Sequence, residues 1–451
     1  MALTAIIVLG AFLRFYLLYS GMHFDVDEAN HVKSVYGIWT NHQLLTQGPP
    51  TSSGLGLYHG AYYYYLLLIP AVIGEGNPLA VVTFCALLST LAVFFIGSAV
   101  MKQYGKLPGI LAALLMAASF DLVQYGRWIW NPNLIPFFMA LSLFALVKTS
   151  PKRPKYLILF SFALSSITQL HLGGFVFVPI YLLLIPFLIR VVKNKRIWAI
   201  SILAFIIPWT PTIYYETTHN FEMFRGIISL LSAQSNISFW QHLTTGYNYM
   251  LFMFDRTLHL PEITRSIFIY SGIAALLLQL KNWRHAESVL LPIYLLISLI
   301  FTFLIVSFYP DYLYVHLAEQ LFVIYIVLVV FILQILFMHN ETIIVSLLIL
   351  GFFLQQNLTL FQDKIVNGSH QYEIIDKACR SLKDQHLDNV EMMVNNQKNP
   401  VYLTYVCLNQ YGVHTGSKFT LTLSPDQAKG LGRPIEQYMF NNKVIDPSIK
   451  N

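Results

Sequence analysis

Charged residues are scarce in this sequence. Asp, Glu, Lys and Arg make up 11% of its 451 residues, whereas 56% are hydrophobic and 15% are aromatic. A soluble core of this length cannot bury so many apolar side chains, so the composition excludes an ordinary soluble enzyme and predicts an integral membrane protein. The net charge of +6 is explained mostly by basic loops, and we expect no nucleic-acid partner.

Cysteines are few, and metal-binding motifs are absent from the sequence. Of the three cysteines, Cys85 lies in an apolar run, while Cys379 and Cys407 lie in the polar tail. An oxidising compartment could pair the latter two, but the sequence alone leaves their distance open. Neither CxxC nor HExxH occurs, so spacing signals no metal site. We expect no cofactor, and nothing in the sequence requires a divalent metal.

Long apolar runs dominate what is present. Runs of roughly 17 to 25 residues can cross a bilayer as helices, because a helix satisfies its own backbone hydrogen bonds. The first run lacks a basic n-region and a small-residue cleavage motif, which favours a retained helix over a cleaved signal peptide. We predict about eleven spans, at 1–20, 79–101, 107–124, 134–148, 155–171, 174–190, 197–214, 264–281, 288–308, 319–338 and 341–359.

The short apolar segment Tyr62–Ile73 decides the orientation of the chain. It is rich in tyrosine and contains Pro70, and counting it as a span would reverse every later loop. If it lies along the interface instead, the basic loops all face the cytoplasm, as the positive-inside rule requires. We therefore predict an interfacial helix here and a cytoplasmic N-terminus. The basic groups are Lys102 with Lys106, Lys148 with Lys152, Arg153 and Lys155, Arg190 with Lys193, Lys195 and Arg196, and Lys281 with Arg284.

The extracytoplasmic face then collects the polar loops, which are 21–78, 125–133, the turn at His171, 215–263, 309–318 and the tail after residue 360. In the tail, a helical period over 372–382 and strand-like patterns over 390–394 and 401–407 predict a small α/β domain. We predict two domains in a multi-pass protein of the plasma (inner) membrane: 1–359 within the membrane and 360–451 outside it.

The most informative polar segment lies in the first external loop, 21–78. It reads Phe24-Asp25-Val26-Asp27-Glu28-Ala29-Asn30-His31, with three carboxylates in four residues. Acidic residues at the mouth of a span are costly, so they indicate chemistry at the bilayer surface. Helix capping is the alternative, with Asp25 or Asp27 as N-cap and Glu28 in the first turn of a helix over Ala29–Trp39. Both interpretations can hold together.

Several motifs in the first half of the chain together resemble the GT-C class of membrane glycosyltransferases. They are Arg14 in the first span, Asp-x-Asp-Glu in the first external loop, a tyrosine-rich segment after His59-Gly60, and the loop Tyr125-Gly126-Arg127-Trp128-Ile129-Trp130-Asn131-Pro132-Asn133. The sequence is similar to the protein O-mannosyltransferase and aminoarabinose transferase families, in the bacterial glycosyltransferase family 39 group. The resemblance covers 1–215 in motif order and continues to about 360 in hydropathy.

The resemblance implies an inverting transferase that moves a monosaccharide from a polyprenyl-phosphate donor to an acceptor hydroxyl on a protein, lipid or glycan. Asp27 matches the acid of the family's Asp-Glu pair and would act as general base, with Glu28 as its catalytic neighbour. A positioned carboxylate of this kind contributes about 10² to 10⁴ in rate. The lipid phosphate leaves as an anion, so cationic or hydrogen-bonding groups must meet it.

Candidates for the phosphate contact lie in the external loops. Arg127 ends a span beside two tryptophans, with snorkelling to headgroups as the alternative. His59 stands where relatives often carry a Pro-rich or Lys-bearing sequence, and His171 lies at a turn between spans. Asn131 replaces the Asp of an Asp-Pro pair in some relatives, which argues against a shared carboxylate metal site. Further candidates are Arg225 and Arg256 for the phosphate, and Asp25, Trp128, Asn131, Tyr312 and His316 for other substrate contacts.

Two other functions stay open on the sequence alone. A transporter or flippase of lipid-linked sugars would carry ionisable residues deep in its spans and repeat symmetry, and neither is evident here. A surface-polysaccharide polymerase or ligase would centre on a large late external loop with Arg and His. Loop 215–263 fits that description, with Arg225, Arg256, His219, His242 and His259.

Overall fold

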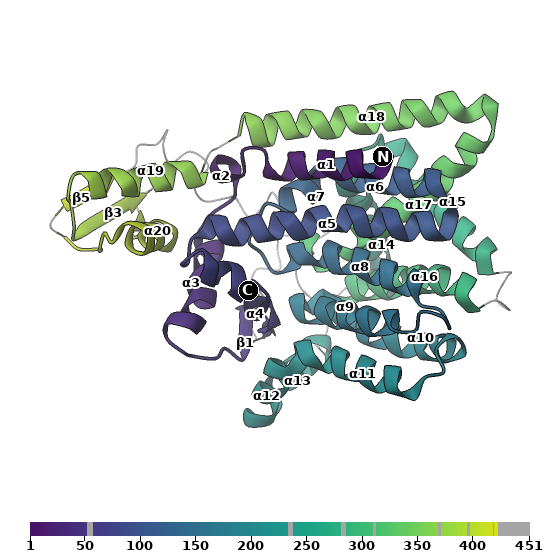
Figure 1. The fold of residues 1–451 in the computed structure, drawn as a ribbon, viewed down its shortest axis with the longest axis horizontal. Helices are drawn as coiled ribbons and strands as arrows, with labels where there is room; N and C mark the ends of the chain where they lie inside the picture. The colour runs from purple at the N-terminus through teal and green to yellow at the C-terminus, as the bar shows by residue number, and fades with distance from the viewer. Residues whose placement is uncertain are drawn as a thin grey trace.

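A bundle of long helices, lying side by side, makes up most of the molecule, and a smaller unit projects from one end (Figure 1). The computed structural model describes residues 1–51, 57–232, 238–280, 286–309, 313–368, 371–394, 397–417 and 419–422. Helix α17 (Gln320–Met338) is deeply enclosed, since every residue from Gln320 to Phe331 is buried. A helix that is apolar all round is stable only when other helices surround it, which explains its central place.

The first third of the chain forms the opening loop and the helices that support it. Short helices and a two-stranded antiparallel ribbon, β1 with β2, connect α1 to α5. The elements are α1 (Ala2–Phe15), α2 (Leu18–Gly21), α3 (Val26–Thr40), β1 (Gln47–Pro50), β2 (Tyr58–Gly60), α4 (Tyr62–Ile73), α5 (Pro78–Tyr104), α6 (Lys106–Ala118), α7 (Phe120–Tyr125), η1 (Pro132–Leu134) and α8 (Ile135–Lys148).

The remaining elements complete the bundle and build the projecting unit. In the bundle they are α9 (Tyr156–Leu170), η2 (Leu172–Val176), α10 (Phe177–Val191), α11 (Lys195–Ile206), η3 (Ile207–Trp209), α12 (Thr210–Thr218), α13 (Glu222–Ser232), α14 (Phe239–Leu258), α15 (Glu262–Gln279), α16 (Ala286–Phe308), η5 (Val315–Ala318), α17, η6 (Asn340–Thr342), α18 (Ile343–Phe361) and η7 (Gln362–Val366). The projecting unit contains α19 (Gln371–Asp384), β3 (Val390–Val394), β4 (Gln397–Lys398), α20 (Val401–Tyr411) and β5 (Phe419–Thr422).

The helices confirm a multi-pass membrane protein, although fewer than eleven of them have the length of a full span. Six described helical stretches are long and apolar enough to cross a bilayer. They are Pro78–Tyr104, Leu172–Val191, Lys195–Thr218, Val289–Phe308, Gln320–Met338 and the stretch that starts at Asn340. The other predicted runs fall on shorter apolar helices or on α15, so the count of eleven stays a prediction. Helix α4 has 12 residues, which is short for a span, as expected of an interfacial helix.

The segment 215–263, predicted as an external loop, is mostly helical, and its side of the membrane stays a prediction. Helices α13 and α14 lie within it, and α14 meets α15 at an angle of 105°. Between them His259 adopts a left-handed backbone conformation with φ of 50°. These helices are amphipathic, so a search for continuous apolar runs does not detect them.

The tail has the predicted α/β character with one correction. The helix over 372–382 and the strand over 390–394 correspond to α19 and β3, whereas 401–407 lies in α20 and is not a strand. The buried residues of α20 include Tyr402, Leu403 and Val406, which follow the period of a helix and not of a strand. Strand order in the sheet is β4-β3-β5.

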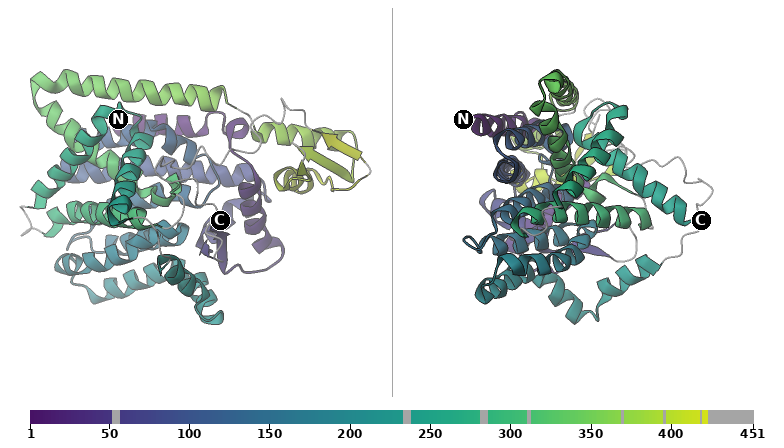
Figure 2. Two further views of the ribbon diagram at one scale, coloured as in Figure 1. Left: turned by 180° about the vertical axis from the view of Figure 1, so that it is seen from behind. Right: turned by 90° about the vertical axis from the view of Figure 1, so that its right-hand side faces the viewer.

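A disulfide and several interdomain hydrogen bonds fix the projecting unit. Cys379 of α19 is joined to Cys407 of α20 by a disulfide bond. The Tyr19 hydroxyl donates to Asp376 at 2.7 Å, and the Tyr405 hydroxyl donates to the Gly76 carbonyl at 2.9 Å. The unit therefore packs on α2, on α3 and on the turn before α5, beside the first loop (Figure 2).

Candidate active site

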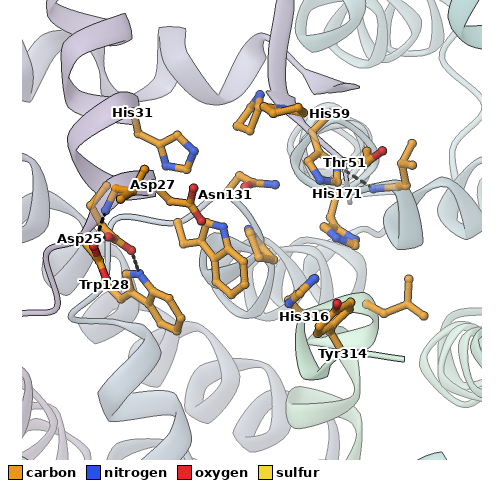
Figure 3. A pocket seen from close by; sticks show the side chains of 18 of the residues that line it. Asp25, Asp27, His31, Thr51, His59, Trp128, Asn131, His171, Tyr314 and His316 are labelled. Atoms are coloured by element: carbon orange, nitrogen blue, oxygen red, sulfur yellow. Dashed lines mark hydrogen bonds between the residues drawn. The ribbon is translucent and has the colours of Figure 1, made fainter. Parts of the chain in front are cut away.

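A cavity of about 520 Å³ opens between the first loop and the ends of the bundle helices. Two groups of side chains face each other across it (Figure 3). We call Asp25, Asp27, Glu28, His23 and His31 the acid wall, and His59, His171 and His316 the histidine wall. Of the residues predicted from sequence, the cavity is lined by Asp25, Asp27, Glu28, His59, Trp128, Asn131, His171 and His316.

The acid wall is built on the N-terminus of α3. Asp25 is the N-cap: its carboxylate accepts from the Val26 amide at 2.8 Å, and its own amide donates to Glu28 Oε2 at 2.7 Å. The two residues form a capping box, which satisfies backbone groups that the helix itself leaves unpaired. The capping interpretation is therefore correct for Asp25 and Glu28, and it leaves Asp27 available for another role.

Glu28 is turned into the protein. It is 1% exposed, and Oε1 accepts a hydrogen bond from the Trp128 indole. Burial raises the pKa of this carboxyl to about 7, with a further contribution from the charge of Asp27 and an opposing one from the Trp128 hydrogen bond. Since its oxygens are held by Trp128 and by the backbone of Asp25, Glu28 is placed to position its neighbours more than to meet a substrate.

Asp27 and His31 face the cavity from one side of α3, four residues apart (Figure 3). Asp27 is exposed, and no group in the described ranges donates a hydrogen bond to its carboxylate. His31 Nδ1 lies 3.2 Å from the Ile129 carbonyl oxygen, which can only accept, so Nδ1 carries the proton. Burial lowers the pKa of His31, while Asp27 opposes that shift. The neutral ring therefore has a bare Nε2.

The histidine wall presents the opposite ring nitrogens. His59 Nδ1 accepts the Leu172 amide at 3.2 Å, and His171 Nδ1 accepts the Gly173 amide at 3.1 Å. In the neutral rings the proton therefore lies on Nε2. Burial, with further contributions from His171 and His31, lowers the pKa of His59 well below its ordinary value. This wall thus offers neutral N–H donors.

His316 completes the histidine wall. The rings of His59 and His171 stack with centroids 4.4 Å apart, and His316 meets His171 edge-on at 5.1 Å. Burial, with a smaller effect of His59, lowers the pKa of His316 to about 3. All three rings come from different elements: β2, the junction of α9 with η2, and η5.

Two glycines let these elements approach closely enough to gather the histidines. A Cβ atom on Gly60 would overlap Gln169 of α9, and one on Gly173 would overlap the Leu317 carbonyl of η5. Gly60 follows His59, and Gly173 lies two residues after His171. Only glycine allows such a close approach at these two positions, and this approach places the nearby histidines, His59 and His171, at the cavity.

Two tryptophans connect the walls. Trp128 stacks on Trp130 with centroids 4.6 Å apart, and Trp130 contacts the His316 ring at 4.5 Å. The amide nitrogen of Asn131 donates to the Leu170 carbonyl, which ties this loop to α9 beside His171. Stacked indoles of this kind are suited to the apolar face of a sugar or to a prenyl chain.

The structure does not place Arg127 in the cavity, contrary to the prediction that it contacts the donor phosphate. Its guanidinium donates to the carbonyls of Leu13, Arg14, Tyr16 and Leu17, at the end of α1. Arg127 is 1% exposed. It thereby satisfies the carbonyls that a helix end leaves unpaired. Within the described residues, the cavity lining contains neither Lys nor Arg.

The cationic side chains of 215–263 also lie outside the cavity lining. Arg256 and His259 both pair with the fully buried Asp121 of α7, with His259 Nε2 at 2.7 Å. His219 stacks on Tyr215, and His242 contacts the Ser307 carbonyl at 2.9 Å. Arg225 is exposed on α13. Tyr312, a predicted substrate contact, falls outside the described residues.

Some polar lining residues are not among the candidates named from the sequence, including His23, His31 and Thr51. His31 carries a detectable signal, since it follows Asp27 by four residues and so shares its helix face. The others come from loops, where no periodicity indicates which side chain faces inward. Among the described residues no group of three or more His, Cys, Asp or Glu is arranged to hold a metal ion.

Comparison with solved structures shows the fold. ArnT from Cupriavidus metallidurans bound to undecaprenyl phosphate has a TM-score of 0.57 at 10% identity, with 94% of this chain and 86% of ArnT covered. The apo form of ArnT gives 0.56 at 11% identity, covering 96% of this chain and 88% of that chain.

A second solved fold is similar over nearly the whole of this chain. The Archaeoglobus fulgidus oligosaccharyltransferase in complex with Zn and sulfate gives a TM-score of 0.52 at 12% identity, covering 95% of this chain. This chain spans 63% of the length of that archaeal protein. No family model matches the sequence, and no curated protein matches it. Membership of glycosyltransferase family 39 stays a prediction, whereas the resemblance at the level of fold is confirmed: the chain has the fold of the GT-C membrane glycosyltransferases.

Proposed function

We propose that the protein is an inverting glycosyltransferase that moves a monosaccharide from a polyprenyl-phosphate donor to an acceptor hydroxyl. One observation carries the proposal: a single cavity has a carboxylate and a bare imidazole nitrogen on one wall and imidazole N–H donors on the other. Transfer of a sugar away from a phosphate needs both. A proton must be accepted from the nucleophile, and negative charge must be stabilised on the leaving group.

Asp27 is the proposed general base. As the acceptor oxygen forms its bond to the anomeric carbon, the hydroxyl proton passes to the Asp27 carboxylate. The bond between that carbon and the phosphate oxygen breaks, and the lipid phosphate leaves with the electron pair. Attack from the face opposite the phosphate inverts the anomeric configuration, which agrees with the base and the phosphate donors lying on opposite walls (Figure 3).

His59 and His171 are the proposed phosphate contacts, and His316 adds a third ring. His59 and His171 are buried, and neutral N–H donors on buried rings bind an anion more strongly than they would in bulk solvent. Trp128 and Asn131 are proposed to contact the sugar, with Asp25 and Glu28 holding the wall in place. The proposal needs no metal and no cofactor.

A lipid-linked donor is supported by the fold and by the composition. The similar ArnT structure holds undecaprenyl phosphate, and the cavity here is lined by residues at the ends of apolar helices, such as His171 after α9 and Tyr309 after α16. The disulfide between Cys379 and Cys407 is typical of an oxidising compartment. We propose that the cavity and the C-terminal unit face the extracytoplasmic side of the inner membrane, with a cytoplasmic N-terminus. The acceptor is a protein, a lipid or a glycan.

The alternative of a polysaccharide polymerase or ligase rested on Arg225, Arg256, His219, His242 and His259. None of these lines the cavity, so no observation favours that reading over the transferase. A flippase would need ionisable groups along a path between helices. The buried ion pair of Arg256 with Asp121 instead joins α14 to α7.

The test uses the purified protein in lipid bilayers with a panel of polyprenyl-phosphate monosaccharides. We expect release of polyprenyl phosphate with at least one of them when a suitable acceptor extract is present, and loss of that release in Asp27→Asn. Asp388→Asn, which changes an exposed carboxylate of the C-terminal unit, serves as the matched control. Equal turnover by Asp27→Asn and wild type would rule out the assigned base.

A further inference from the structure

A buried side-chain pair links the C-terminal unit to the cavity wall. Gln371, the first residue of α19, is 4% exposed, and its Oε1 lies 2.7 Å from His23 Nδ1. His23 lines the cavity. Other bonds between the unit and the bundle, such as the Asn409 amide to the Glu75 carbonyl at 3.0 Å, lie outside the cavity lining. Gln371, unlike Asn409, therefore contacts a residue of the cavity lining.

This pair determines which nitrogen of His23 carries a proton. The Gln371 oxygen can only accept, so His23 donates from Nδ1, and its neutral ring has a bare Nε2. That Nε2 lies 3.5 Å from Glu28 Oε1. The ring also meets Trp128 edge-on at 4.9 Å, and the Trp128 indole donates to the same Glu28 oxygen. One proton can therefore be held between His23 and Glu28.

We propose that Gln371 is a positioning residue through which the C-terminal unit fixes the tautomer of His23 and so controls the proton held by the His23–Glu28 pair. Burial and the charge of Asp27 raise the pKa of Glu28 to about 7, which agrees with a proton held near neutral pH. Holding that proton removes one negative charge from the neighbourhood of Asp27. The inference concerns the resting wall and does not depend on the identity of donor or acceptor.

Other polar groups also face this pair, and the test must separate their effects. On α3 and the preceding segment they are Asp25, Asp27 and His31. From α4, the Tyr63 hydroxyl lies 3.4 Å from His31 Nδ1. Trp128, in the loop after α7, donates to Glu28, and Tyr402 of α20 lies near Asp25. Gln371 is the group from α19 that contacts His23 directly.

The experiment follows Trp128 fluorescence during a pH titration of the full protein without substrate, with Trp128→Phe subtracted. The wild type should show a midpoint near 7, which Glu28→Gln abolishes. In Gln371→Leu the His23 ring loses its acceptor at Nδ1, so its proton can move to Nε2. His23 Nε2–H can then donate to the Glu28 carboxylate and stabilise its anionic form. We therefore expect the midpoint of the titration to be about one pH unit lower. Gln371→Met, whose thioether is only a weak acceptor, should shift the midpoint in the same direction and serves if the leucine variant does not fold.

Two controls decide the result. Asn409→Ala removes a hydrogen bond of the same interface and should leave the midpoint unchanged. In a His23→Gln background, Gln371→Leu should cause no further shift, because its effect passes through His23. An unshifted midpoint in folded Gln371→Leu and Gln371→Met, or an undiminished shift without His23, overturns the proposal. Since no transfer is measured, this outcome is independent of whether the protein is a glycosyltransferase.

Discussion

The two walls of the cavity use the same residue type in opposite ways. On the acid wall, His23 and His31 have Nδ1 beside oxygen acceptors, so their Nε2 is bare in the neutral ring. On the histidine wall, His59 and His171 accept backbone amides at Nδ1, so their Nε2 carries the proton. The comparison teaches that the hydrogen-bond partner at Nδ1, and not the residue type, decides whether a buried histidine presents an acceptor or a donor at Nε2.

This division matches the two demands of sugar transfer from a phosphate. The acid wall has Asp27 exposed to the cavity beside a bare imidazole nitrogen, and both are proton acceptors. The histidine wall has N–H donors but, in the described part of the lining, no Lys or Arg near it. Recognition of the anion is therefore proposed to depend on hydrogen bonds from buried imidazole N–H groups, which are stronger there than in water.

The largest effect is expected on the acid wall. Asp27→Asn keeps the shape of the side chain but cannot accept a proton, so we expect a loss of about 10² to 10⁴ in transfer rate. Donor binding should stay within a factor of about two, because the histidine wall is intact. Single-turnover transfer and equilibrium donor binding measure the two separately. If Asp27→Asn instead weakened donor binding and spared the rate, the roles of the walls would be reversed.

A smaller effect is expected on the histidine wall. His59→Asn and His171→Asn retain an oxygen that can accept the Leu172 or Gly173 amide, but each loses the outer N–H. A hydrogen bond to a charged group contributes about 1.5 to 3 kcal/mol, so donor affinity should fall about 10- to 100-fold for each. His219→Asn, outside the cavity, should bind the donor like wild type. Unchanged donor affinity in both His59→Asn and His171→Asn would show that the histidine wall does not bind the donor phosphate.

Donor binding to the histidine wall should also depend on pH. Burial lowers the pKa of His316 to about 3, so this ring is neutral at pH 7, and a bound anion raises its pKa. As pH falls through the pKa of the donor-bound form, binding takes up a proton, and affinity for the donor, a phosphodiester of constant charge, should rise by up to about tenfold per pH unit. Isothermal titration in buffers of different ionisation enthalpy measures the uptake. A release of protons on binding would contradict this arrangement.

The acid wall was predictable from sequence to a large extent, and the histidine wall only in part. Three acids in four residues after an apolar run mark both a helix start and a reactive surface, and the structure has the capping box there. His59 and His171 were candidates because of their loops. Which ring nitrogen carries the proton was not predicted. His59 Nδ1 accepts the Leu172 amide only where β2 meets η2, whereas His171 Nδ1 accepts the nearby Gly173 amide as the N-cap of η2.

The errors have a common physical origin. Arg127 was expected at a phosphate because an arginine at the mouth of a span resembles an anion site; its actual partners are carbonyl oxygens at the end of α1. Backbone acceptors leave no trace in the sequence. The helix at 401–407 was predicted as a strand because the segment is short and rich in β-branched and aromatic residues, which are typical of strands. Burial of one face in the complete unit decides between them.

The smallest effect on transfer is expected for Arg127→Ala, which tests whether the cavity really lacks a guanidinium. Removing the side chain leaves carbonyls at the end of α1 without their donor, so unfolding should become easier by about 3 kcal/mol. Donor affinity in the folded fraction should be unchanged, because Arg127 lies outside the lining. Arg127→Lys can reach only some of the carbonyls and should recover part of the stability. A loss of donor affinity without a loss of stability would instead show that Arg127 contacts the donor phosphate, and that the histidine wall does not bind the phosphate alone.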